Sequence, residues 1–167
     1  MASDVPTRPD ARRVAQQLAS ISLFASLPAD ELVALAERGQ VRSLEPDSTV
    51  VQQGDDADAL YVMLEGSARV VMRREDGGEI QLGEQHAGSY FGELALLDGR
   101  PRSASVMTLE PTTCSVVTRD ELRSAISANP DIAMGLIATL IDRARIATDN
   151  VKNLALMDVY GRVARLL

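Results

Sequence analysis

One stretch of the chain carries the residue types that a phosphate-binding site needs. It reads FGELALLDGRPRSASV over residues 91–106. Gly92 allows a backbone N–H to approach a ligand closely, and the turn that begins at Glu93 presents free N–H groups at the positive end of a helix dipole. The planar guanidinium of Arg102 suits two phosphate oxygens at once, and Ser103 adds a hydroxyl donor beside it. The stretch therefore predicts an anion site.

The acidic residue of this stretch, Glu93, limits the kind of ligand that can bind there. A carboxylate next to a bound anion makes sense only if Glu93 accepts a hydrogen bond from a sugar hydroxyl and does not face the phosphate. Two or three charge-assisted hydrogen bonds, at about 1.5–3 kcal/mol each, together with base stacking would give micromolar affinity, about −8 kcal/mol. Taken singly, Arg102 is explained as an ordinary strand arginine and Glu93 as a first-turn acid stabilised by the dipole. Their combination with Gly92 and Ser103 favours binding.

Composition excludes several other kinds of site. The chain has 167 residues and a net charge of −7, from 17 Lys and Arg against 24 Asp and Glu, which argues against nucleic-acid binding by these residues alone. Cys114 is the only cysteine, which excludes an internal disulfide and a thiolate metal cluster, and we expect it to be buried and inert. His86 is the only histidine, which excludes multi-histidine metal sites and makes a Ser-His-Asp hydrolase improbable. No apolar run has the length of a membrane span and the N-terminus lacks a signal-peptide pattern, so we expect a cytoplasmic protein.

The middle of the chain has the pattern of an all-β domain. After Gly39 the segments are short, rich in β-branched residues and separated by turn residues such as Asp76-Gly77-Gly78. The predicted strands are 40–44, 49–52, 59–65, 68–74, 79–84, 103–108 and 113–118. Many short strands at even spacing indicate a barrel or jelly roll, interrupted by a single helical turn at 93–97.

Helices are expected on both sides of these strands. The N-terminal ones are 11–19 and a second that starts at Ser26 or Pro28 and stops at Gly39. After the strands come 119–128 and a long helix capped by Asn129, which continues to about Asp158, where another helix can begin. The long helix has an apolar seam with alternating steps of three and four residues: Ile137, Leu140, Ala144, Ala147, Val151 and Leu154. This heptad spacing favours a partner helix, because the rod of roughly 40 Å is longer than the domain's own core needs. Packing of the seam on the chain's own barrel is the alternative.

The anion-site stretch resembles a known family. FGELALL and RPRSASV resemble the phosphate-binding cassette of cyclic-nucleotide-binding domains. The upstream QGDDADALYVMLEGSARV is also similar, with Gly54, Tyr61 and Gly66 at the family's turn glycines and aromatic position. The chain from Asn129 onward resembles the dimerisation helix and linker of catabolite-activator-type (Crp/Fnr) transcription regulators. The resemblance implies a mainly β fold with flanking helices, the family's double-stranded β-helix or jelly roll, followed by a long dimerisation helix.

The resemblance also implies which residues contact the ligand. In the cassette these are Gly92, Glu93, Leu94, Ala95, Arg102 and Ser103. The backbone of the turn would face the phosphate and sugar, the carboxylate would take the ribose 2′-hydroxyl, and the guanidinium and serine hydroxyl would hold the cyclic phosphate. No catalytic residue, metal or cofactor is implied, so we do not expect an enzyme.

The long helix would supply the contacts that distinguish one base from another. Arg143 and Thr148 align near positions that face the base in bacterial members of the family. Those members often carry two adjacent hydroxyl residues there, whereas in this chain Ala147 precedes Thr148. We therefore expect cAMP as the ligand, with cGMP as an open alternative and a cyclic dinucleotide as a third.

The expected organisation has four segments. Residues 1–20 form a lead-in and short helix, 21–128 the β-roll with flanking helices, 129–157 the dimerisation helix, and 158–167 the start of a C-terminal DNA-binding domain that is missing here. The resemblance thus implies a homodimeric cyclic-nucleotide sensor that reaches DNA only through a winged helix-turn-helix, and that has no membrane partner.

Three other functions were compared with this one. The first alternative is a dimerisation or regulatory module of the same fold that no longer binds a cyclic nucleotide or that senses another effector. A cupin-type enzyme needs several histidine and carboxylate metal ligands, which a single histidine does not supply. A redox or gas sensor needs several cysteines or a pair of axial haem ligands, and His86 lies in a polar GEQHAG segment that is typical of a solvated loop.

Overall fold

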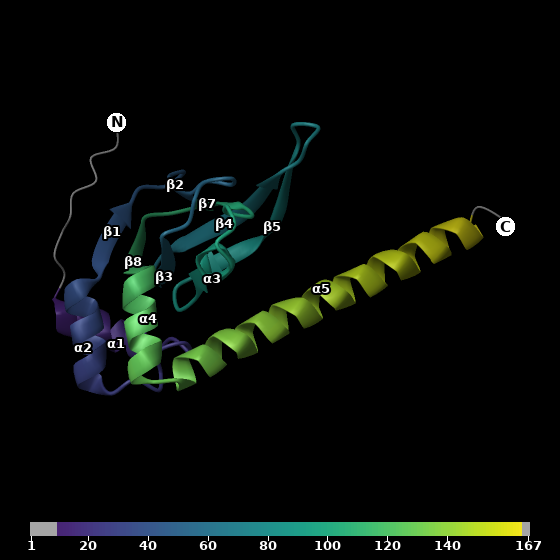
Figure 1. Ribbon diagram of the computed structural model, residues 1–167. Coiled ribbons are helices and arrows are strands. Elements are labelled where there is room, and N and C mark those ends of the chain that lie inside the picture. Colours follow the sequence, from purple (N-terminus) through teal and green to yellow (C-terminus); the bar gives the residue numbers. More distant parts are fainter. Residues whose placement is uncertain (1–9, 165–167) are drawn as a thin grey trace.

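The computed structural model describes residues 10–164, with side chains described as far as Asp149 (Figure 1). In this part of the chain, strands form two four-stranded antiparallel sheets, one in the order β1-β8-β3-β6 and the other in the order β2-β7-β4-β5. The strands are β1 Gln40–Leu44, β2 Thr49–Val51, β3 Ala59–Glu65, β4 Ser67–Arg73, β5 Glu79–His86, β6 Tyr90–Phe91, β7 Ser105–Thr108 and β8 Thr112–Thr118. The predicted mainly β fold with flanking helices is confirmed.

The helices begin and end close to the predicted positions. They are α1 Ala11–Ala19, α2 Ala29–Arg38, α3 Glu93–Asp98, α4 Arg119–Ala128 and α5 Asp131–Ala164. Local sequence explains several of these ends. Pro28 precedes the first turn of α2, where its missing N–H costs nothing. Thr118 and Glu121 form a reciprocal capping box at the start of α4, which satisfies two backbone N–H groups that would otherwise lack partners.

Three local predictions were wrong. Strand β6 was missed, because two residues are too few to show an alternating pattern. The strand predicted from Ser103 begins only at Ser105, because the backbone of Arg102 bonds instead to the 54–55 turn. The helix predicted to start at Asp158 is not a separate element, because α5 continues through that position without a break. No proline interrupts the sequence there.

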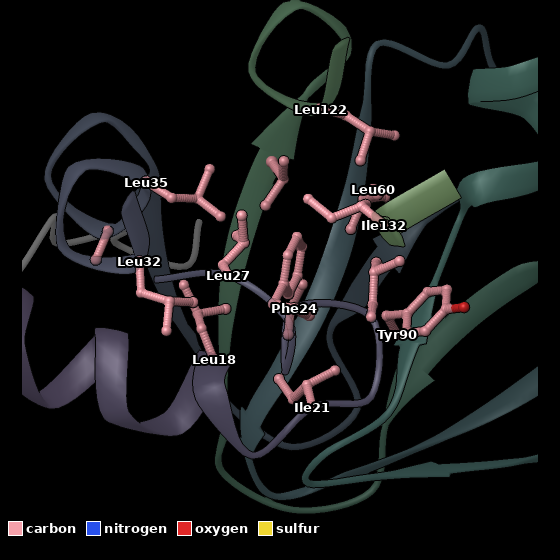
Figure 2. Close-up of a cluster of buried hydrophobic side chains, with 14 of the residues drawn as sticks. Leu18, Ile21, Phe24, Leu27, Leu32, Leu35, Leu60, Tyr90, Leu122 and Ile132 are labelled. Carbon is pink, nitrogen blue, oxygen red and sulfur yellow. The ribbon is translucent and has the colours of Figure 1, made fainter. Parts of the chain in front are cut away.

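Two apolar clusters hold the fold together. The smaller lies between the two sheets and contains Met63, Phe91 and Cys114. Burial raises the pKa of the Cys114 thiol to about 12, so the thiolate needed for reactivity is scarce at neutral pH. The larger cluster packs the helices against the outer face of the β1-β8-β3-β6 sheet. Figure 2 shows Phe24 in the middle of this cluster, between side chains from the N-terminal helices and from the sheet.

Helix α5 differs from the others in length and exposure. It has 34 residues, which at 1.5 Å per residue is about 50 Å, and it runs past α3 as a single rod (Figure 1). Its first turns are anchored by the buried Ile132 and Leu136.

Among the described residues, no single helix is long and apolar enough to cross a membrane. The pair Arg119–Ala128 and Asp131–Asp149 passes that test only when taken together, across a bend of 115°.

Truncating Phe24 tests how strongly the helical layer is attached to the sheet. We expect Phe24→Ala to lower the free energy of unfolding by about 3–5 kcal/mol, because a fully buried ring leaves a cavity that its neighbours fill only partly. Urea unfolding followed by circular dichroism measures the change. Leu109→Ala is the control, because Leu109 is largely exposed and should lose far less. Equal losses in the two variants would contradict the packing described for this cluster.

Candidate ligand-binding site

The guanidinium of Arg102 lies inside the protein. The side chain is 5% exposed. Nη1 donates to the carbonyl oxygen of Gly92 at 2.8 Å and Nη2 to that of Ala59 at 2.6 Å. The guanidinium carbon also sits 5.8 Å from the centre of the Tyr61 ring, which stacks on Phe91 with 5.5 Å between ring centres. These contacts fix the side chain between the two sheets, and three of its five N–H donors remain for another acceptor.

This buried charge has no acidic partner. No carboxylate among the described residues lies within ion-pair distance of the Arg102 guanidinium. A buried cation is costly unless an anion compensates it, and two carbonyl oxygens compensate it only in part. The arrangement therefore favours an anionic ligand at this place.

Glycine at position 92 makes the placement of Arg102 possible. Gly92 has a φ of +86°, a conformation that L side chains rarely adopt, and it directly precedes α3. A Cβ atom added there would overlap Nη1 of Arg102. Gly92 therefore serves both the turn into α3 and the close approach of the guanidinium.

An ion pair joins the start of α3 to the long helix. Glu93 is 1% exposed, and one of its carboxylate oxygens accepts from Nη1 of Arg143 on α5. Nη2 of Arg143 donates to the carbonyl oxygen of Tyr90 at 3.2 Å. The second carboxylate oxygen of Glu93, Oε2, is buried and has no hydrogen-bond partner among the described residues. A buried acceptor without a partner indicates a place for a ligand donor.

A cavity connects these groups. Its polar side chains come from four places: helix α3, the loop before β7, helix α5 and strand β5. Its apolar wall is formed by residues of both sheets. The lining residues are Val51, Val70, Gln85, Phe91, Gly92, Glu93, Leu94, Ala95, Arg102, Ser103, Ala104, Val106 and Arg143.

The structure gathers seven of the eight residues that the sequence assigned to the site. Gly92, Glu93, Leu94, Ala95, Arg102, Ser103 and Arg143 all line the cavity. Thr148 does not. Its hydroxyl donates to the carbonyl oxygen of Ala144 one turn earlier, and it borders a separate hollow on the surface of α5 with Ile141 and Arg145. Within one chain, Thr148 is thus apart from the other predicted site residues.

Two features of the site were not found from the sequence. The first is the ion pair of Arg143 with Glu93, since the sequence placed Arg143 near a base and not against an acid. The second is Gln85, which lies one residue past the predicted end of its strand. It faces inward because it is opposite the buried Ala68 in the β4–β5 register. Among the described residues, no three His, Cys, Asp or Glu side chains lie close enough to hold a metal ion.

The sequence is similar to those of known proteins over much of its length. Residues 41–129 match the family model of the cyclic nucleotide-binding domain. The chain is 36% identical over 121 residues to the cAMP-activated global transcriptional regulator CRP of Escherichia coli, which covers 72% of this chain and 58% of that protein. It is 32% identical over 150 residues to the CRP-like cAMP-activated global transcriptional regulator of Mycobacterium tuberculosis, which covers 90% of this chain and 67% of that protein.

A solved structure shows the same similarity in three dimensions. The catabolite activator protein of Thermus thermophilus superimposes with a TM-score of 0.73 and 30% identity, over 80% of this chain and 63% of that one. The chain thus spans less than two thirds of the length of the Escherichia coli relative and of this neighbour.

Substituting Gly92 tests the close approach of Arg102. We expect Gly92→Ala to destabilise the fold by about 1–2 kcal/mol from the positive φ and by about 1–3 kcal/mol more from overlap with the guanidinium. Gly88→Ala is the matched control, because Gly88 has a φ of +89° but open space where a Cβ would lie. Denaturant unfolding measures both variants. If Gly92→Ala costs no more than Gly88→Ala, the overlap does not govern this site.

Proposed function

The chain belongs to the cyclic nucleotide-binding domain family, as a CRP-like regulatory domain, and from that premise we propose that it binds cAMP in the cavity beside Arg102. The single observation that carries this proposal is the buried guanidinium without an acidic partner. A cyclic phosphate supplies the missing negative charge and offers oxygens to the donors that the protein leaves unused. Ser103, exposed at the rim of the same cavity, supplies a further hydroxyl donor.

The free oxygen of Glu93 supports a ribose contact. Arg143 occupies one carboxylate oxygen, which orients the group, and Oε2 remains available to accept from the 2′-hydroxyl. The backbone N–H groups in the first turn of α3, at Leu94 and Ala95, have no partners within the helix and complete the sugar–phosphate contacts.

We propose cAMP in preference to cGMP because the relatives from Escherichia coli and Mycobacterium tuberculosis are described as cAMP-activated. The base contacts predicted for Arg143 and Thr148 remain proposals, and they do not identify the base. Arg143 is already engaged by Glu93, and Thr148 lies outside the cavity of its own chain. cGMP and cyclic dinucleotides therefore belong in every binding experiment.

We also propose that the domain dimerises along α5. Four large apolar side chains on this helix are exposed: Met134, Ile137, Ile141 and Ile146. Three of them fall on one stripe, with Ala144 continuing it, and Ala144 and Ala147 of the predicted seam are exposed as well. A second copy of the helix would cover this stripe. The seam positions Val151 and Leu154 lie beyond the residues whose side chains the structure describes.

The remaining parts of the proposal concern the whole protein. We propose that the domain is a regulator's sensor without catalytic activity of its own, that it acts in the cytoplasm, and that ligand binding is coupled to DNA binding by a C-terminal domain. The link from Glu93 through Arg143 to α5 supports coupling along the long helix. A module of this fold that binds no cyclic nucleotide is the second candidate, and the next experiment separates the two.

Removing the Arg102 guanidinium should abolish binding. We expect cAMP at a hundred times its dissociation constant to stabilise the wild-type chain by about 2.7 kcal/mol, and Arg102→Ala to weaken binding at least about a hundredfold, since two charge-assisted hydrogen bonds are lost. Calorimetric titration and thermal unfolding measure the two effects.

Arg100→Ala is the matched control for this experiment. Arg100 lies two residues earlier in the same loop, is exposed and makes only a long ion pair with Asp98, so its loss should leave affinity unchanged. If Arg102→Ala folds and binds cAMP as the wild type does, the assignment of the phosphate site is wrong. If the wild-type chain binds no cyclic nucleotide, the second candidate is favoured.

A charge on the exposed stripe of α5 should break the dimer. We expect Ile141→Glu to raise the dimer dissociation constant at least tenfold, because the carboxylate would be desolvated in an apolar interface. Ile146→Glu is the control: at 3.6 residues per turn it lies about 140° around the helix from Ile141, and it is comparably exposed, at 61% against 47%. Sedimentation equilibrium measures both, and equal effects would contradict the stripe as the interface.

A further inference from the structure

Gln85 faces the cavity from strand β5. In the β4–β5 register it is the partner of Ala68, which is fully buried in the cluster between the sheets. Side chains on directly paired residues point to the same face of a sheet, so Gln85 points inward, while its neighbours Glu84 and His86 are exposed. Gln85 itself is half-buried and lines the cavity that holds Glu93 and Arg102.

The surroundings of Gln85 leave its amide without a partner. The β-sheet residues that share the cavity with it are apolar, and they include Val51, Val70 and Val106. Its side chain makes no hydrogen bond to any other residue that the structure describes. Gln81 on the same strand differs in both respects, since it is exposed, does not line the cavity and donates to Glu84 at 3.2 Å.

A ligand that fills the cavity decides what this amide does. Binding removes water from the half-buried carboxamide, and a desolvated amide is unfavourable unless the ligand replaces the lost hydrogen bonds. The apolar side chains on that wall offer no replacement. Gln85 therefore favours binding only if a polar group of the ligand lies within hydrogen-bond distance of its amide. Without such a group, the wild-type glutamine would weaken binding.

We infer that Gln85 is a further ligand-binding residue, whose amide hydrogen-bonds the sugar–phosphate ring of the cyclic nucleotide. This inference rests on the proposed function. The ring is the part of the ligand concerned because three of the other four polar side chains of the cavity, Glu93, Arg102 and Ser103, are those proposed to hold the ribose and cyclic phosphate. The fourth, Arg143, pairs with Glu93. Strand β5 then contributes a polar contact of its own.

Two substitutions at position 85 test this assignment with cAMP and cGMP as probes in calorimetric titrations. Gln85→Leu keeps the size of the side chain and removes its hydrogen bonds, and we expect affinity to fall about three- to tenfold, equally for both nucleotides. Gln85→Glu places a negative charge beside the phosphate, and we expect a larger fall that diminishes as salt is added. Gln81→Leu is the matched control and should bind as the wild type does.

The outcomes separate this inference from the proposed function. If the wild type binds cAMP and Arg102→Ala does not, but Gln85→Leu binds as tightly as the wild type or more tightly, Gln85 is not a ligand contact. If Gln85→Leu weakens only one of the two nucleotides, the contact is to the base and the assignment to the ring is overturned. If the wild type binds neither nucleotide, the proposed function fails and this inference fails with it. Thermal unfolding without ligand identifies any variant whose loss comes from misfolding.

Discussion

A positive charge held inside a β-roll without a negative partner is the constraint that organises the candidate site. The carbonyl oxygens of Gly92 and Ala59 orient the Arg102 guanidinium but cannot neutralise it. Keeping it there requires a glycine at position 92, since any Cβ would occupy the same space. The Tyr61 ring, stacked on Phe91, lies next to the guanidinium and offers no carboxylate. A site built this way is incomplete until an anion enters it.

The parts of the structure that depend on local sequence could be predicted. The β-branched segments between glycine turns predicted all seven of these strands within two residues at each end, and the proline and capping residues located the helix starts. The cassette was recognisable because Gly92, Glu93, Arg102 and Ser103 lie within twelve residues of one another at a spacing that resembles a family motif, and all four line one cavity.

The parts that depend on distant contacts could not be predicted. Arg143 is fifty residues from Glu93, and nothing in the local pattern of α5 indicates that this arginine turns toward the cassette while Thr148 does not. Gln85 lies one residue past the predicted strand 79–84, in a polar segment, and the structure extends that strand to His86. Only the pairing with Ala68 identifies its inward direction. Contacts between distant parts of the chain decide both cases, and neither composition nor periodicity specifies them.

Helix α5 is continuous, so a small rotation of the helix near the cassette would move its far end through a larger distance. Arg143, which joins α5 to Glu93 of the cassette, lies twelve residues after the first residue of the helix. This leaves 21 residues, about 32 Å, between that contact and Ala164. A tilt of about 5° at that contact would sweep the far tip through about 3 Å, roughly the length of a hydrogen bond. A rotation of α5 too small to change the β-roll would thus produce a larger displacement at Ala164.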